Sequence, residues 1–555
     1  MSSTRKNVLF LTVDALTYSR LGAGGAAPSP SPNLDRLLAG GLSFSRTFAA
    51  GCPTMFATPA IFTSTLPLDD GGYGLGIRNR GTSFVELFRD AGYHTGGFCT
   101  GLYQGRIYGY DRGFEDYHEF FELGLFQKIL RGLYLDYLTS MRYMGALNWE
   151  VCVATLREWL AEFIPALRRY CEERIAEVRD GRVAPSPLLH GRCFESVGDF
   201  ARIEARRFEV DPTGYAAALL REEHGESVFD ILPRFTRRAE LPRVKRINRW
   251  LSNQSTGLSI PALAPSGRYV VDQLQRWIER QPAGEPWFAW AHLLDCHDLN
   301  FASFDAAVPA AEVREELREA ERLRRALLKA RGESAGNVQY DLAIRYSDAQ
   351  VARVVRFLED RGLRDDTLLV VTSDHGGWKN GFPARPAGTD YMSFFDEMYH
   401  VPLVFSHPDI APRQVDALTS SLDLAPTLLH LAGLPVPEEY RGEVASAPGW
   451  PGRRFVQMEH MGSGPCDFRL KNLQLCIRGH DAKMVCETPP LWSNCEGALR
   501  ALFDLEADPM EQENLALSGD AFPPQMQWLV EATEARLQEL LDHTPRPDVP
   551  ALAYA

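Results

Sequence analysis

Leu369-Val-Val-Thr-Ser-Asp-His-Gly-Gly377 is the stretch of sequence that decides the fold. Its apolar run ends in Asp374 and His375, which predicts a buried strand with a carboxylate and an imidazole at its carboxyl end. In open α/β sheets, ligands bind at that edge. Oxygen and nitrogen donors of this kind suit a divalent cation, and the two glycines allow a sharp turn around it. An ordinary strand-to-loop turn capped by Asp374 is the alternative interpretation.

Predicted strands and helices alternate along much of the chain. This alternation predicts an α/β fold with a mostly parallel central sheet sandwiched by helices. Strands are expected near 8–13, 94–99, 287–292, 366–372 and 401–405, and helices near 33–42, 84–91, 309–332, 340–360 and 422–432.

The character of the sequence changes in two places. Residues 122–265 are predicted to be a mainly helical insertion, because bulky apolar residues recur there at helical spacing. After residue 446, short alternating strands precede a helix near 525–542, which indicates a small antiparallel subdomain. We therefore expect a main α/β domain over residues 1–445 and a C-terminal subdomain over 446–555.

Composition excludes some classes of protein. The chain has 555 residues, 45% of them hydrophobic, which is enough for a large core. Its formal net charge of -14 repels phosphates, so we expect no nucleic-acid partner. No apolar run has the length of a membrane span, and the run at 8–13 is too short for an export signal. We expect a cytoplasmic protein with reduced cysteines.

Two further segments complete a candidate site. Asp14 ends the first predicted strand, as Asp374 and His375 end a later one, and such ends can meet at one edge of a parallel sheet. Between them, Cys52-Pro-Thr-Met-Phe-Ala-Thr-Pro-Ala-Ile-Phe-Thr-Ser64 is rich in hydroxyl groups and precedes a helical stretch. A hydroxyl at a helix start lies among free N–H groups that stabilise negative charge. A metal beside that hydroxyl would make it a nucleophile.

These segments resemble the sulfatase branch of the alkaline phosphatase superfamily. The resemblance runs in the family's order from residue 7 to 514, apart from the insertion. It implies an alkaline phosphatase-like fold and a divalent metal (Mn, Zn, Ca or Mg) held by Asp14, Thr54, Asp374 and His375. It rests on Ser31–Leu37 with Gly41–Phe44 (the family's first helix), Tyr340–Asp348, Asp366–Gly376, His400–Leu403, Leu422–Leu429 and Asp504–Asn514.

The chain departs from the formylglycine sulfatases at their reactive residue. Counting back from Thr63 by the family's spacing places the nucleophile at Thr54, which cannot become formylglycine. The family's arginine is Thr58 here, and its sulfate-gripping Gly-Lys-x-His aligns with Cys99-Thr-Gly-Leu102. Relatives with a threonine nucleophile include phosphodiesterases and phosphoglycerol and phosphoethanolamine transferases. His375 agrees with them, since many formylglycine sulfatases carry Asn at that place.

The resemblance therefore predicts a hydrolase or transferase that cleaves a phosphate mono- or diester, or a phosphonate ester, through a covalent Thr54 intermediate. A true sulfatase, using Thr54 or a converted Cys52, is the nearest alternative. A catalytically silent binding scaffold is the second alternative. The expected substrate is a small-molecule, glycan or lipid ester. The insertion is expected to be a lid, a dimer surface through which an oligomer could form, a membrane-leaning element or a buried helical layer.

The remaining candidates are histidines and cations near these segments. The resemblance implies that His297 protonates the leaving group, a role suited to imidazole. Asp295, His297 and His400 could instead hold a second metal. Substrate contacts are expected from Lys379, Arg78, His292 and His460, for which surface or core positions are the alternative interpretation.

Overall fold

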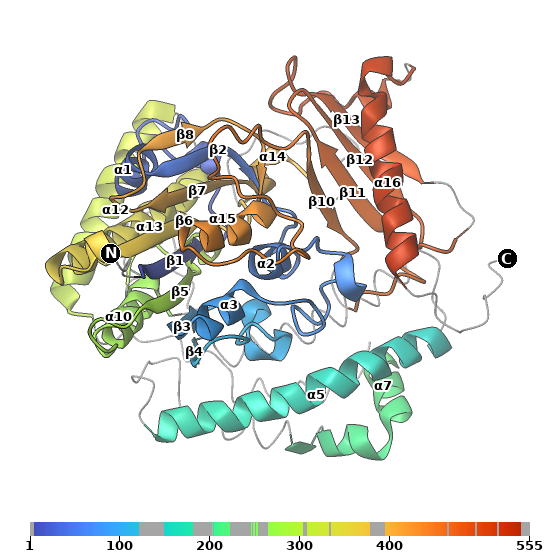
Figure 1. Cartoon of the computed structure of the whole chain (residues 1–555), viewed down its shortest axis with the longest axis horizontal. Coiled ribbons are helices and arrows are strands. Elements are labelled where there is room, and N and C mark those ends of the chain that lie inside the picture. Colours follow the sequence, from blue (N-terminus) through green and yellow to red (C-terminus); the bar gives the residue numbers. More distant parts are fainter. Residues whose placement is uncertain are drawn as a thin grey trace.

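The computed structural model describes most of the chain (Figure 1). The described residues are 5–120, 149–180, 202–203, 205–221, 246, 248–249, 251–252, 265–303, 308–331, 335–377, 394–462, 465–493, 497–518 and 521–544. They form one large mixed sheet with helices around it and a second, smaller sheet.

The large sheet has nine strands in the order β4-β3-β5-β1-β6-β7-β2-β8, with β9 paired to β2. The pairings are parallel except those of β7, which runs antiparallel to β6 and β2. The expected α/β fold with a mostly parallel sheet is confirmed. The strands are β1 Asn7–Val13, β2 Leu42–Phe48, β3 His94–Cys99, β4 Asp116–Glu119, β5 Trp287–Leu293, β6 Thr367–Thr372, β7 His400–Ser406, β8 Arg413–Val415 and β9 Thr419–Ser420.

Helices cover both faces of this sheet. Trp290 of β5 packs on Phe62 of α2, whereas Gly96 of β3 faces Trp277 of α10. Gly96 pairs with Ala289, the neighbour of Trp290, and successive strand residues point to opposite faces. Hence α2 and α10 lie on opposite sides. The helices are α1 Pro32–Gly40, α2 Thr54–Thr63, α3 Phe84–Asp90, α5 Trp149–Arg179, α7 Pro212–Arg221, α10 Gly267–Ile278, α11 Asp295–Asp298, α12 Ala310–Arg331, α13 Ala335–Asp360, α14 Asp396–Tyr399, α15 Leu424–Leu431 and α16 Gln527–His543.

One segment has a different structure from the one expected. The resemblance placed Gly41–Phe44 with the first helix, but α1 ends at Gly40 and β2 begins at Leu42. A side chain at Gly41 would lie 2.7 Å from the carbonyl oxygen of Phe405, so this residue passes close to the backbone of β7. β2 then fills the gap between β7 and β8.

The described part of the insertion is helical. α5 runs along the outside of the main domain, with α7 packed against it (Figure 1). Its apolar stripe, including Leu156, Leu160 and Phe163, is buried. Polar contacts also hold it, since Arg78 forms an ion pair with Glu162 at 2.7 Å. Among the described residues, none of the helices combines the length and the apolar character that a membrane crossing requires.

The C-terminal strands form a separate antiparallel sheet in the order β10-β11-β12-β13, as expected, and α16 packs on it. Ion pairs join this sheet to the main domain. Lys483, fully buried, contacts Asp396 at 2.8 Å and also Glu511. Arg536 of α16 binds Glu459 at 2.8 Å and Asp69 at 2.9 Å. The strands are β10 Val456–His460, β11 Leu473–Arg478, β12 Ala482–Thr488 and β13 Ala498–Asp504.

Candidate active site

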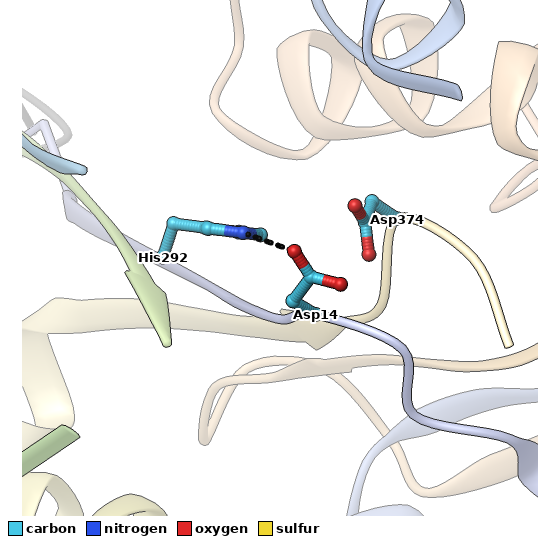
Figure 2. A group of neighbouring side chains, drawn as sticks. All are labelled: Asp14, His292 and Asp374. Atoms are coloured by element: carbon cyan, nitrogen blue, oxygen red, sulfur yellow. Dashed lines mark hydrogen bonds and ion pairs between the residues drawn. The ribbon is translucent and has the colours of Figure 1, made fainter. Parts of the chain in front are cut away.

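Three neighbouring strands of the large sheet deliver polar side chains to one edge. β1 lies between β5 and β6, and Thr12 pairs with His292 on one side and Thr372 on the other. Just beyond these positions, Asp14 follows β1 and Asp374 follows β6. Figure 2 shows that Asp14, His292 and Asp374 lie together. One ligand atom from each lies within 4.8 Å of the others, so the three could hold a metal ion.

The turn after β6 is held tightly in place. The Ser373 hydroxyl accepts the Leu16 N–H at 2.9 Å and lies 2.5 Å from the carbonyl oxygen of Val13. A side chain at Gly376 would lie 2.0 Å from the carbonyl oxygen of Glu397, and one at Gly377 would lie 2.8 Å from that of Ala15. The two glycines are therefore required because other backbone segments pass so close, rather than by the sharp turn expected from the sequence.

Thr54 is the first residue of α2 and is buried. Its Oγ1 atom lies 3.2 Å from Asp14 Oδ2 and 3.2 Å from His375 Nε2. Thr54 is thus in contact with both strand ends although it is distant from them in sequence. N–H groups in the first turn of a helix have no partner within the helix and favour negative charge.

His375 presents one nitrogen to this cluster. Its Nδ1 donates to the carbonyl oxygen of Gly376 at 2.6 Å, which leaves Nε2 facing Thr54 and Asp14. Metal-ligating histidines usually have their other nitrogen bonded in this way. Burial alone lowers the pKa of His375, but the carboxylates of Asp374 and Asp14 outweigh it and hold the pKa well above its usual value. The site therefore favours a positive charge.

Within this cluster, Asp14 Oδ1 and Asp374 Oδ2 are buried and have no hydrogen-bond partner. Burial raises the pKa of Asp14, but the imidazoles around it, His297 first, hold the pKa well below its usual range, so Asp14 is ionised. An unpaired buried carboxylate is costly unless a cation is present. Asp14, Asp374, His375 and the Thr54 hydroxyl therefore fit a divalent metal, and their oxygen and nitrogen donors do not select one metal.

A cavity of about 90 Å³ opens beside this cluster. His297 of α11 lies on its wall, with a side chain that is 44% exposed. Its Nδ1 lies 2.9 Å from Oδ1 of the buried Asp298, so Asp298 can accept the Nδ1 proton and fix the ring. The other lining residues are Ala15, Cys52, Pro53, Cys296, Tyr340, His375, Gly376, Gly377 and Met398.

Several expected site residues lie in other surroundings. His400 stacks between Tyr18 and Phe48, and its Nε2 donates to the carbonyl oxygen of Ser45 at 2.7 Å. Burial lowers the pKa of His400 to about 4. These contacts make it a packing residue, so a second metal would have to rely on Asp295 and His297 alone.

Two other candidates also pack within the fold, and one cannot be placed. Arg78 pairs with Glu162 on α5 instead of lining the cavity. His460 stacks on Phe56 and Phe394. Lys379 lies outside the described residues.

The residues that contact His292 were not among the expected site residues. This fully buried histidine contacts Thr12 and Gln104, and Thr12 in turn contacts Trp290. Gln104 comes from the loop after β3, where the sulfate-gripping residues were expected. Strand alternation could have placed Thr12 on the same face as Asp14, but no local pattern points to Gln104.

Comparison with known proteins agrees with this geometry. The sulfatase family model matches residues 6–139 and 248–434, more than half of the chain. The protein belongs to the sulfatase family. Among curated relatives, the choline-sulfatase of Rhizobium meliloti is 33% identical over 181 residues, 32% of each chain. The Delta 4,5-hexuronate-2-O-sulfatase of Bacteroides thetaiotaomicron is 31% identical over 174 residues, 30% of this chain and 34% of its own. This sulfatase-family chain spans about a third of the length of these curated relatives.

Solved structures share the fold over nearly the whole chain. The phosphonate monoester hydrolase of Agrobacterium radiobacter has a TM-score of 0.53 at 19% identity, covering 97% of this chain and 96% of its own. BT4656 in complex with its substrate D-glucosamine-2-N,6-O-disulfate has a TM-score of 0.53 at 14% identity, covering 98% and 100%. The sulfatase-family fold predicted from the sequence is confirmed, and these neighbours include proteins acting on phosphorus and on sulfur.

Proposed function

We propose that this sulfatase-family protein is a metal-dependent hydrolase or transferase that cleaves a phosphate mono- or diester, or a phosphonate ester, through Thr54. The position of Thr54 Oγ1, 3.2 Å from both Asp14 Oδ2 and His375 Nε2, carries the proposal. Asp14, Asp374, His375 and Thr54 would hold a divalent cation. When bound, such a cation supplies charge stabilisation at the nucleophile and at the reacting ester.

Side chains of the site can accept the proton of the Thr54 hydroxyl and donate a proton to the leaving group. Asp14 Oδ2 is an acceptor within reach of the Thr54 hydroxyl proton, and the cation held by His375 would lower the pKa of that hydroxyl. Attack of Oγ1 on phosphorus would form the Thr54 ester as the bond to the leaving alkoxide breaks. His297, fixed by Asp298, would give that alkoxide its proton. Water, or an acceptor alcohol in a transferase, would then release the phosphoryl group and return the proton.

A sulfuric ester hydrolase is the second candidate, and the sulfatases among the relatives favour it. Cys52, two residues before Thr54, lies beside His375 on the cavity wall. A formylglycine at Cys52 would serve this alternative, and intact-mass measurement detects that conversion. A binding scaffold without activity is the third candidate, which the intact set of Asp14, Thr54, Asp374 and His375 disfavours, because a nucleophile beside a metal site is not needed for binding.

The deciding experiment compares substrates and traps the intermediate. Aryl phosphate, phosphodiester, phosphonate monoester and aryl sulfate substrates would each be tested with Mn²⁺, Zn²⁺, Ca²⁺ and Mg²⁺. We expect turnover of a phosphorus ester, and an acid-quenched reaction should yield a phosphorylated peptide containing Thr54. Turnover of aryl sulfate alone would establish the sulfatase alternative. Metal binding without any turnover would favour the scaffold.

A further inference from the structure

His292 could have either of two roles, and the hydrogen bonds of its ring distinguish them. Its Nε2 lies 3.1 Å from Asp14 Oδ2, close enough to donate a proton to Asp14 or to join Asp14 and Asp374 around a cation (Figure 2). An imidazole binds a metal only through a nitrogen with a free lone pair. The position of the ring proton therefore separates a hydrogen-bond donor from a metal ligand.

Hydrogen-bond donors surround the other ring nitrogen, Nδ1. Thr12 Oγ1 lies 2.7 Å from it and Gln104 Nε2 lies 3.4 Å from it. An amide nitrogen only donates.

Thr12 is oriented by a third residue. The indole N–H of Trp290 lies 3.0 Å from Thr12 Oγ1, and an indole nitrogen can only donate. The Thr12 oxygen therefore accepts from Trp290, and its own hydroxyl proton is left to point at Nδ1 of His292. Both neighbours thus donate to Nδ1, which must carry the lone pair.

We propose that His292 is held as the tautomer with its proton on Nε2, so that it is a positioning residue for Asp14 and not a metal ligand. The Nε2 proton is donated to Asp14 Oδ2. This fixes the carboxylate so that Oδ1, which has no hydrogen-bond partner, faces the cation together with Asp374 Oδ2. The inference rests on the metal site of the proposed function.

The same contacts give the loop after β3 a role. Gln104 closes η3 (Leu102–Gln104), and the Thr100 hydroxyl donates to the His292 carbonyl oxygen at 2.8 Å. This loop aligns with the sulfate-gripping segment of other family members. In this chain the loop contacts Nδ1 and the carbonyl oxygen of His292, on the side away from Asp14, and so orients the ring.

Spectroscopy on the unaltered protein tests whether His292 coordinates the metal, which the proposed tautomer forbids. Pulsed electron paramagnetic resonance of the Cu²⁺-loaded protein counts coordinated imidazoles through their remote nitrogens. We expect one imidazole, that of His375, and no change in His292→Gln. Two imidazoles in the natural protein, falling to one in His292→Gln, would overturn the inference.

Mn²⁺ affinity, measured by calorimetry without substrate, tests the positioning role. His292→Ala should weaken binding by roughly 10–100-fold, as loss of a residue that orients a ligand does. His292→Gln should stay within about threefold, because its amide N–H can replace the donor. Thr12→Val should weaken binding and Thr12→Ser should restore it.

Thr95→Val is the matched control, because the hydroxyl of this buried threonine of β3 donates to the Gly113 carbonyl oxygen and accepts the Glu115 N–H, so its loss should not affect the metal. Equal losses in His292→Gln and His292→Ala, or wild-type affinity in Thr12→Val, would contradict the role. Neither measurement needs turnover. A protein that binds metal in this way but cleaves no ester would remove the proposed activity and leave this inference intact.

Discussion

The ends of β1 and β6 and the junction with the C-terminal sheet both bury charged side chains, and they differ in how the charges are balanced. At the ends of β1 and β6, Asp14 Oδ1 and Asp374 Oδ2 have no hydrogen-bond partner. At the junction with the C-terminal sheet, Glu459 is held by two hydrogen bonds from Arg536. Buried charges with a partner of opposite sign belong to the structure of the fold. Buried carboxylates without such a partner are retained where a bound ligand supplies the opposite charge. Other buried carboxylates, such as Asp298, also have an oxygen without a hydrogen-bond partner, so the candidate site differs in bringing two such oxygens into one cluster with His375.

Removing the Thr54 hydroxyl should have the largest effect. Thr54→Val keeps the shape of the side chain but loses the nucleophile, so kcat on the best ester substrate should fall at least about 10³-fold. Thr63→Val on the same helix is the control, since the Thr63 hydroxyl bonds to Pro59 and Thr65 instead. Turnover near wild type in Thr54→Val would show that the cluster at the ends of β1 and β6 is not the active site.

Breaking the paired region should affect stability and not metal binding. Arg536→Met leaves the Glu459 carboxylate buried without its cation, which should cost about 3–5 kcal/mol in the free energy of unfolding. Urea denaturation measures this loss, and calorimetry should show unchanged Mn²⁺ affinity. Arg325→Met, which removes an exposed helical ion pair with Glu321, should leave stability nearly unaltered. A large loss of metal affinity in Arg536→Met would show that the junction with the C-terminal sheet also contributes to metal binding, contrary to this prediction.

Asp374 should behave in the reverse way to Arg536, because its substitution should weaken metal binding rather than stability. Asp374→Asn keeps an acceptor for the N–H groups of Ala15 and His375 but removes the unpaired charge. Mn²⁺ binding should weaken at least about 100-fold. Without metal, the melting temperature should change little, because the Asp374 charge is balanced only by the His375 ring, whose Nε2 lies 3.7 Å from Oδ2. A loss of stability as large as that expected in Arg536→Met would show that this carboxylate belongs to the scaffold.

Asp298 combines features of both regions, since its buried carboxylate is paired with the partly exposed imidazole of His297. Asp298→Asn should lower kcat by about tenfold through a poorly oriented general acid. The loss should be larger for alkyl leaving groups, which need a proton, than for activated aryl ones, with little change in KM. Equal losses on both kinds of substrate would argue against an acid at His297.

The smallest expected effect is the dependence of metal affinity on pH. The pKa of His375 lies well above its usual value, so below that pKa the ring is protonated and a cation must displace the proton. Mn²⁺ affinity should therefore rise with pH by up to about tenfold per unit, with release of about one proton. Calorimetry in buffers of different ionisation enthalpy counts that proton. His375→Asn should abolish the release.

Local patterns in the sequence predicted the cluster at the ends of β1 and β6 better than the junction with the C-terminal sheet. The apolar run into Asp374 and the strand before Asp14 could be predicted because both are continuous in sequence, and the structure places their ends together. The role of Gln104 and the stacking of His400 depend on which segments meet in space. The burial of Lys483 could not be predicted either, because a lysine in an alternating strand normally faces water.

The order of strands in the large sheet also sets when the site can exist. β1, at residues 7–13, has as its two neighbours β5, at 287–293, and β6, at 367–372. During synthesis, the first strand emerges long before either of its neighbours. Asp14 cannot meet Asp374 until the 360 residues that follow Asp14, up to and including Asp374, have also left the ribosome. Contacts so distant in sequence make folding slow. Truncation before β6 should yield a chain without metal affinity, however much of it has already folded.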